Sequence, residues 1–287
     1  MKNETFYRRK SELIAFGLSS PLNIVGIVVV AGLLLIAICA PLIAPYDPYE
    51  VNPIERISGI SFSHPMGTDN LGRDVLSRII YGARTALFVG IIGALVASSI
   101  GLTLGIIAAY SGSLVDNLLL LIFDVLRAFP SIILILVIVS AVGPSLINIV
   151  IALGITIMPA YGRAARARAL SVREEDYIKA AEAMGATRSR IIRKHITKNV
   201  AGPLIIMAGM DVGYFITLEA GLSFLGLGVP PPMASWGKML RVGFEFTLKD
   251  PLMLIWPCIA LFISVAGFSL LAEALRSYLD PAVRRSI

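Results

Sequence analysis

Mainly apolar stretches alternate with polar segments along the whole chain. Crossing the hydrocarbon core of a bilayer takes about 20 consecutive, mostly apolar residues. Stretches at or near that length cover residues 22–44, 85–110, 117–142, 146–161, 200–222 and 251–275. The pattern therefore predicts an all-α fold, a polytopic transmembrane helical bundle of about six spans. The first stretch follows a basic N-terminus, but it is longer than the roughly 7–15-residue core of a signal peptide and is predicted to be a retained anchor.

The polar segments define the expected domain organisation. A transmembrane domain over 22–275 lies between an N-terminal segment, 1–21, and a tail, 276–287. Of the 25 Lys and Arg, 17 fall in the two terminal segments and in the loop 163–198, against seven in 46–84 and 229–250. Because Lys and Arg are retained on the cytoplasmic side, both termini and the loop 163–198 are predicted to be cytoplasmic, and 46–84 extracytoplasmic.

Composition supports the membrane assignment and narrows the function classes. The chain is 56% hydrophobic and 15% charged, with a mean hydropathy of +0.81, whereas soluble domains average about 45–50% apolar and about 25% charged. A net charge of +6 would suit a nucleic-acid binder, but the orientation rule accounts for it. Cys39 and Cys258 lie in apolar stretches, so we expect small buried side chains without a disulfide or metal role.

The basic loop predicts a helix, a glycine turn and a second helix. Ser171 to Glu174 match a capping box, which places a helix start near Val172. Gly185 is a natural left-handed stop, after which Thr187 can cap the next helix. The alanines before Gly185 leave one side almost without side chains, so a partner protein can approach closely. An ordinary solvated loop and an amphipathic helix on anionic lipid remain alternatives.

Charges inside the apolar stretches are candidates for a translocation path. Asp124 and Arg127 are three residues apart, so they can form a salt bridge on one helical face. Asp211 and Glu219 are about 80° apart around a helix at about 100° per residue. Unpaired carboxylates in a membrane usually face a protein interior or a water-filled cavity. The candidates are Asp124, Arg127, Asp211 and Glu219.

The sequence carries no recognisable catalytic or metal-binding motif. The chain lacks a Gly-x-x-x-x-Gly-Lys-Ser/Thr phosphate loop, and no Ser/His/Asp or metal-ligand set has credible spacing. His64 stands beside a proline and is predicted to be structural. We therefore expect no enzyme activity, no metal and no cofactor in this chain.

The loop also resembles a family motif. The alanines before Gly185, together with the run from Arg190 to Ile196, resemble the EAA loop in the membrane subunits of binding-protein-dependent ABC importers. Lys179 stands where that motif usually has glutamate, and Thr197 and Lys198 replace its usual leucine and proline. The resemblance implies the type I ABC importer permease fold and a loop, 171–198, that seats in a groove of the ATPase subunit. The implied coupling residues are Tyr177, Ala180, Ala181, Glu182, Met184, Gly185, Ala186 and Arg190.

Two further segments narrow the resemblance to one branch. Residues 64–78, and residues 219–232 followed by Ser235-Trp236-Gly237, are similar to the C-type subunit of the peptide and nickel permease branch. The first segment is expected to carry the solute-binding protein and part of the outer gate, or alternatively to pack as a lid on the permease's own helices. Its candidate residues are Asp69, Asn70, Arg73 and Asp74.

The resemblance also implies partners and a location. It implies a homologous second permease subunit, two ABC ATPase subunits that bind ATP and Mg²⁺, and an extracytoplasmic solute-binding protein in the plasma (inner) membrane of a prokaryote. No nucleic acid is expected. Di- or oligopeptides are the expected substrates, with nickel chelates or other solutes as the alternative within the family. A different class, an ion-coupled secondary transporter, would use the carboxylates within the spans.

Overall fold

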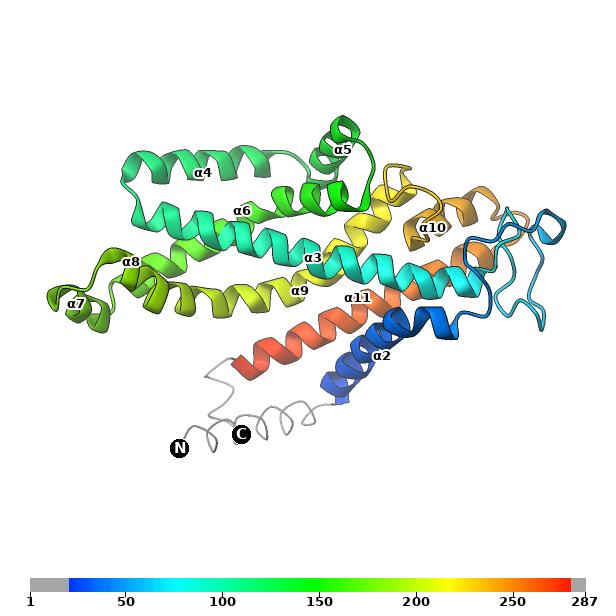
Figure 1. Cartoon of the computed structure of the whole chain (residues 1–287), viewed down its shortest axis with the longest axis horizontal. Coiled ribbons are helices and arrows are strands. Elements are labelled where there is room, and N and C mark those ends of the chain that lie inside the picture. Colours follow the sequence, from blue (N-terminus) through cyan, green and yellow to red (C-terminus); the bar gives the residue numbers. More distant parts are fainter. Residues whose placement is uncertain (1–20, 280–287) are drawn as a thin grey trace. The chain divides into compact units, whose positions relative to one another are not determined.

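The computed structural model describes residues 21–279 and consists of helices joined mostly by short connections, with one long segment, residues 44–74, between α2 and α3 (Figure 1). Five helices are long and apolar enough to cross a membrane, and α4 with α5 makes a sixth span if that bent pair is counted as one. Most of the N-terminal segment expected over 1–21, and residues 280–287 of the expected tail, lie outside the described residues. The helices are α2 (Pro21–Ile43), α3 (Val75–Tyr110), α4 (Ser113–Ala128), α5 (Ser131–Val142), α6 (Leu146–Arg173), α7 (Asp176–Ala183), α8 (Arg188–Ile191), α9 (Thr197–Phe224), α10 (Trp236–Glu245) and α11 (Leu252–Leu279), with a 3-10 turn η1 (Pro53–Glu55) and a π-helical turn η2 (Ile192–Ile196).

Two helices extend well beyond the apolar stretches that predict them. Helix α3 begins at Val75, ten residues before the expected span at 85, because the Asp74 carboxylate caps it by accepting the Ser77 amide hydrogen at 2.7 Å. Helix α6 continues to Arg173 rather than ending near 161. Its charged second half stays helical because two of its arginines pair with carboxylates on α4. Hydropathy alone stops at the first charge and misses both extensions.

The span expected over 117–142 is not one continuous helix. Helices α4 and α5 meet at an angle of 95°, with the break at Phe129 and Pro130. Proline lacks an amide hydrogen and pushes the residue before it out of the helical region. Phe129 has φ −92° and ψ 141°, an extended conformation. The apolar pattern continues across this proline, although the proline itself signals a break in the helix.

The chain forms two compact units, each described by itself. The first comprises the residues up to Gly90 and those from Val212 onward. In it α11 packs against both α2 and α10. A Cβ atom on Gly26 would lie 2.7 Å from the Leu271 backbone nitrogen, so glycine permits the close approach of α2 to α11. The Trp236 indole N–H donates to the carbonyl of Ile79 at 3.0 Å and ties α10 to α3.

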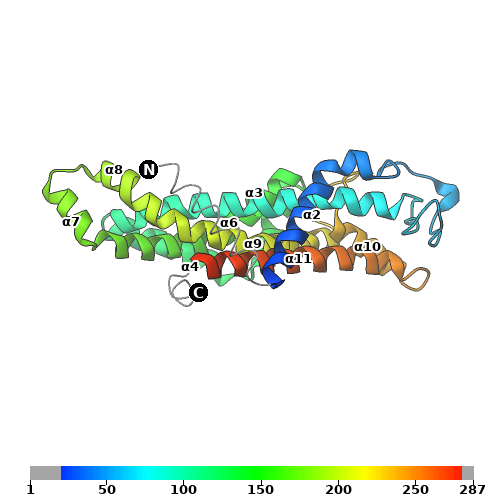
Figure 2. The same ribbon diagram turned by 90° about the horizontal axis from the view of Figure 1, so that it is seen from below.

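The second unit comprises Ile91 to Asp211. Here the last part of α3 packs against α6, and α4 and α5 also pack against α6. The ring of Phe123, which is fully buried, fits against Gly162. In two views α7 and α8 lie beside each other, joined by a turn, at the end of this unit (Figure 2). The unit therefore presents one short helical hairpin beyond its packed helices.

Candidate functional site

The expected helix start near Val172 is wrong. Ser171 and Val172 belong to the last turn of α6, which buries the Val172 side chain to 2% exposure. Burial of this valine prolongs α6, so α7 begins only at Asp176 after Glu175. The capping-box pattern was present, but tertiary packing of the valine outweighs it.

Gly185 terminates α7 in the left-handed conformation, as the sequence predicts, with φ +80°. Its N–H donates to the Glu182 carbonyl at 2.9 Å, and the Ala186 N–H donates to the Ala181 carbonyl at 3.0 Å. This pair of bonds is the Schellman arrangement, which satisfies the last carbonyls of the helix. Beyond Gly185 and its two neighbours, no heavy atom of residues 21–279 is found within 4 Å of the position that a Cβ atom on Gly185 would take. The helix, glycine turn and helix are therefore present, with open space at the turn.

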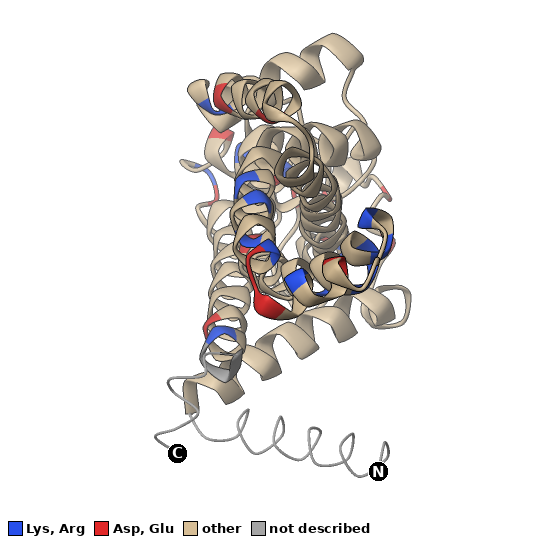
Figure 3. Ribbon diagram, turned by 90° about the vertical axis from the view of Figure 1, so that its left-hand side faces the viewer, with Lys and Arg blue, Asp and Glu red and all other residues tan. Residues whose placement is uncertain are grey.

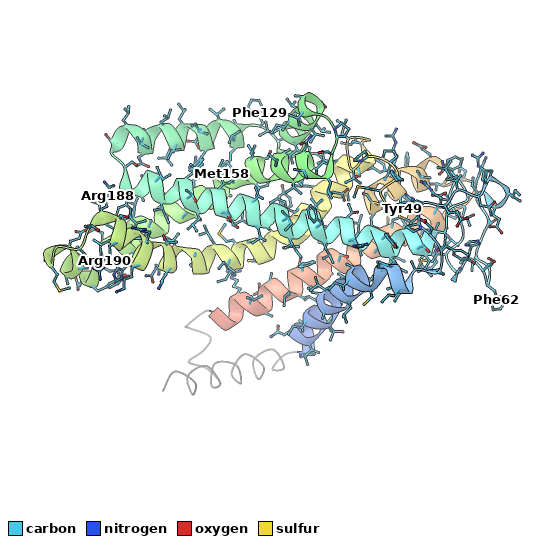
Figure 4. The ribbon with its side chains drawn as sticks, viewed as in Figure 1. Tyr49, Phe62, Phe129, Met158, Arg188 and Arg190 are labelled. Atoms are coloured by element: carbon cyan, nitrogen blue, oxygen red, sulfur yellow. The ribbon has the colours of Figure 1, made fainter. Side chains whose placement is uncertain are left out.

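The hairpin exposes most of the residues expected to couple to a partner. Helix α7 buries Ile178, whereas Tyr177 and Met184 are 46% and 82% exposed. Six of the eight predicted coupling residues are exposed, and Ala181 and Ala186 are half-buried. Viewed end-on, this tip carries interspersed basic and acidic residues, and α8 presents Arg188 and Arg190 beside it (Figures 3 and 4).

A π-helical turn connects the hairpin to the long helix α9. This turn, η2, covers Ile192–Ile196, and the Thr197 hydroxyl donates to the Ile192 carbonyl at 3.0 Å. Tyr177 of α7 reaches the same junction, because its hydroxyl accepts from the Asn199 side chain at 3.2 Å. Sequence reasoning missed the π turn. Single π-helical turns of this kind often occur at functional sites.

Tyr110, at the end of α3, joins the hairpin to the rest of its unit. The Arg173 and Arg188 guanidinium carbons lie 5.6 Å and 5.4 Å from its ring centroid. Both distances are within cation–π range. An apolar cleft of about 650 Å³ adjoins this cluster, with Ile106 and Val115 among its lining residues. The aromatic residue was not singled out from the sequence, because its partners are far away along the chain.

The charges within α4 are paired differently from the prediction. The Asp124 carboxylate forms its ion pair with Arg163 of α6, and among the described residues Arg127 forms none. Asp116, which the sequence analysis overlooked, accepts two bonds from Arg166 at 2.5 and 2.6 Å. Because α4 packs along α6, its two carboxylates lie opposite arginines of α6. Arg127, the partner that the sequence suggested for Asp124, lies on α4 itself, three residues further along.

Both carboxylates of α9 have hydrogen-bond partners. Asp211 accepts from the Tyr161 hydroxyl at 2.6 Å. Glu219 is 1% exposed, and its Oε1 accepts from the hydroxyls of Ser223 at 2.6 Å and Ser235 at 2.8 Å. Neither side chain is therefore an unpaired carboxylate facing a cavity. Glu219 instead joins α9 to the loop that leads into α10.

Replacement of Glu219 separates its acceptor role from its charge. We expect Glu219→Leu to destabilise the chain by about 3 kcal/mol, because two buried hydroxyls lose their acceptor at about 1–3 kcal/mol each. Glu219→Gln keeps an acceptor oxygen and should cost less than about 1 kcal/mol. Thermal unfolding of the purified chain in detergent micelles measures both. Equal destabilisation by the two variants would show that the charge, rather than the acceptor, matters.

The candidate outer-gate residues hold their own segment together. Asp69 is 6% exposed and binds the Arg73 side chain at 2.7 Å, while Asp74 is 2% exposed and lies 2.9 Å from His64 Nδ1. The backbone carbonyl of Asn70 accepts from Arg56 at 2.6 Å. His64 therefore has a structural role, as expected. These contacts favour an internally braced segment over a row of free charges.

The remaining sequence predictions concern metals and cysteines. Cys39 and Cys258 are free, and Cys258 is exposed rather than buried. Exposure at this point reflects an apolar helix surface rather than a polar site. Within residues 21–279 no group of three or more His, Cys, Asp or Glu is placed to hold a metal ion.

Comparisons with known proteins identify the family of the chain. The family model for the binding-protein-dependent transport system inner membrane component matches residues 101–285, and the model for the N-terminal transmembrane domain of oligopeptide transport permease C matches 18–65. The chain is 43% identical to a dipeptide transport system permease protein of Alkalihalophilus pseudofirmus, with 92% of this chain and 86% of that protein covered.

More distant relatives carry other names, and solved structures share the fold. The chain is 34% identical to the oligopeptide transport system permease protein of Bacillus subtilis (93% of this chain, 88% of that protein) and 34% identical to the nickel transport system permease protein of Escherichia coli (93% and 96%). An inward-facing methionine ABC transporter chain superimposes with a TM-score of 0.55 at 18% identity, covering 71% of this chain and 97% of that chain. That similarity supports the fold.

Proposed function

Because the chain belongs to the binding-protein-dependent transport system inner membrane components, we propose that it forms half of the translocation path for di- or oligopeptides. It is a membrane-spanning permease subunit of an ATP-driven ABC importer. The peptide assignment rests on the dipeptide and oligopeptide names of its relatives. A nickel chelate is the second candidate, because a nickel permease protein is also 34% identical.

The observation that carries the mechanism is the open α7–α8 hairpin. We propose that its uncovered face, around Ala180, Met184 and Gly185, seats in a groove of an ATPase subunit. The hairpin is suited to transmit motion because it is connected at both ends to long helices, α6 directly and α9 through η2. The Tyr110 cluster adds a third connection, to α3. Closure of the ATPases would then move these helices and switch the path between its two sides.

The proposed subunit assembly rests on the family, and the proposed orientation in the membrane rests on the distribution of Lys and Arg. We propose a complex with a homologous second permease subunit, two ATPase subunits and one extracytoplasmic binding protein. ATP and Mg²⁺ would bind the ATPase subunits, while this chain would be non-catalytic and hold no cofactor. The excess of Lys and Arg supports cytoplasmic termini and a cytoplasmic hairpin in a prokaryotic plasma membrane.

The binding protein is proposed to contact the segment between α2 and α3. Ile54, Ile60 and Phe62 are 93%, 58% and 109% exposed there, and Phe62 lies at the outer tip of the segment (Figure 4). Exposed apolar side chains that gather on one segment are typical of protein contact sites. The buried Asp69 and Asp74 would brace this platform rather than touch the partner.

ATP-dependent uptake tests the proposal against a secondary transporter. The chain, co-purified with its partner subunits and reconstituted in liposomes, should accumulate a labelled dipeptide only when ATP and the binding protein are present. A nickel chelate supplied in parallel distinguishes the second candidate. Uptake by the chain alone, driven by an ion gradient, would overturn the importer assignment. The partners already found for Asp211 and Glu219 argue against ion coupling at these sites.

A further inference from the structure

A small cavity in the first unit has an uncompensated positive lining. Its volume is about 40 Å³, and it lies between the start of α3 and the helices α10 and α11. The polar lining consists of three cations, Arg73, Arg78 and Lys238, and one carboxylate, Asp69. The remaining lining residues are Val75, Met239, Val242 and Met253. Apolar walls weaken the screening of these charges by water.

The single carboxylate is already used by one of the cations. Asp69 Oδ2 lies 2.7 Å from both Nε and Nη2 of Arg73, while Oδ1 accepts from the Leu71 and Arg73 amides at 2.8 and 3.1 Å. Arg241, on the same helix as Lys238, is likewise paired, with Glu245 at 3.2 Å. The charges of Arg73 and Arg241 are therefore compensated.

The other two cations, Arg78 and Lys238, have no carboxylate of their own: Arg78 shares Asp69 with Arg73 through a longer ion pair. Arg78 is 2% exposed and donates from Nη1 to the Pro48 carbonyl, which is a neutral acceptor. Its Nε is buried without a hydrogen bond and is 3.5 Å from Asp69. Lys238 is half-buried, and its ammonium forms no hydrogen bond or ion pair with any side chain described between residues 21 and 276. Burial, followed by the charges of Arg78, Arg73 and Arg241, lowers the pKa of Lys238.

We propose that this cavity binds one small monovalent anion from solution, a halide or a carboxylate, between Arg78 and Lys238. Buried charges are normally paired, and an anion here would accept from the unused Arg78 Nε and from the Lys238 ammonium. Since a water molecule needs about 10–15 Å³ of such space, the cavity suits an ion of that size and excludes a sugar acid. The site would brace α10 against the start of α3 whichever solute the chain transports.

Anion-dependent stability tests the site. The full-length chain in lipid nanodiscs is unfolded by heat at constant ionic strength and neutral pH, with chloride, acetate or gluconate as the anion. As chloride or acetate rises from about 5 to about 150 mM, we expect a saturable increase of about 3 °C in the unfolding midpoint. Gluconate is too large for the cavity and should have no such effect.

Two lysine variants separate the site from general salt effects. Lys238→Met should abolish the response and, by removing an unpaired charge, raise the midpoint at low chloride above that of the unsubstituted chain. Lys249→Met is the matched control, because Lys249 is exposed and lies over the Phe246 ring; it should keep the full response. Anomalous diffraction from bromide at the cavity would identify a halide site. A response to acetate without a bromide peak would identify a carboxylate site. Equal midpoints in all three anions, or a full response in Lys238→Met, would overturn the proposal.

Discussion

Gly185→Trp is expected to reduce ATP-driven uptake by about 100-fold while leaving the chain folded. The indole would occupy the open face of the α7–α8 turn, where none of the described residues other than Gly185 and its two neighbours has a heavy atom within 4 Å of the added Cβ. The left-handed backbone adds a cost of about 1–2 kcal/mol for a side chain other than glycine or asparagine. A loss of about 2.7 kcal/mol in docking corresponds to the 100-fold effect. The effect is measured as uptake by proteoliposomes and as the amount of ATPase subunit that co-purifies with the chain.

The control for this substitution uses the same position. Gly185→Asn keeps a small residue that tolerates the left-handed conformation, so uptake should stay within about threefold of the unsubstituted chain. Gly59→Trp is a second control, because an added Cβ there also meets no atom within 4 Å, on the segment between α2 and α3. Gly59→Trp should leave ATPase co-purification intact. If Gly185→Trp retained both the ATPase subunits and uptake, the hairpin would not be the coupling surface.

Gly105→Leu is expected to remove most of the folded protein. A Cβ atom on Gly105 would lie 2.6 Å from the Ala165 Cβ and 2.9 Å from the Arg166 nitrogen. Gly101 makes a similar approach, 2.9 Å from the Gly162 nitrogen, so the two glycines form a small-xxx-small contact with α6. Overpacking typically costs about 1–3 kcal/mol. Because backbone atoms block the way here, we expect about 3 kcal/mol or more.

The same substitution at an open glycine isolates the packing effect. Gly209, on α9 in the same unit, has no neighbour within 4 Å of an added Cβ, so Gly209→Leu should change the unfolding midpoint by less than about 2 °C. Size-exclusion profiles and thermal midpoints of both variants in detergent micelles provide the comparison. A Gly105→Leu chain as stable as the Gly209→Leu chain would show that α3 and α6 do not pack at this distance.

The features predicted correctly depend on short stretches of sequence. The apolar stretches predicted a helical membrane protein with about six spans, which the structure and the family both support. Gly185 predicted the turn, because the left-handed stop depends on the backbone of a few consecutive residues. The break at Pro130 has an equally local cause, because a proline disfavours the helical conformation of the residue before it. This proline alone predicts two helices within the stretch 117–142.

The errors arise where packing overrides a local pattern. Ser171 to Glu174 match a capping box, yet burial of Val172 keeps them in α6. The span limit near 161 followed hydropathy, whereas arginines paired with α4 extend α6. In both cases the deciding contact joins residues that are far apart in the sequence. The limit near 85 is different, because the Asp74 cap on Ser77 that extends α3 is a local signal which hydropathy does not include.

The membrane class, the approximate number of spans and the glycine turn follow from the amino-acid sequence alone, because hydropathy and backbone preference act over a few neighbouring residues. The pairing of the charges follows from the packing of the helices. Asp124 with Arg163, Glu219 with Ser235, and Lys238 beside Arg78 without a carboxylate of its own each depend on which faces of distant helices lie opposite each other. Electrostatic energies change steeply with such distances and with burial, and a linear pattern specifies neither quantity.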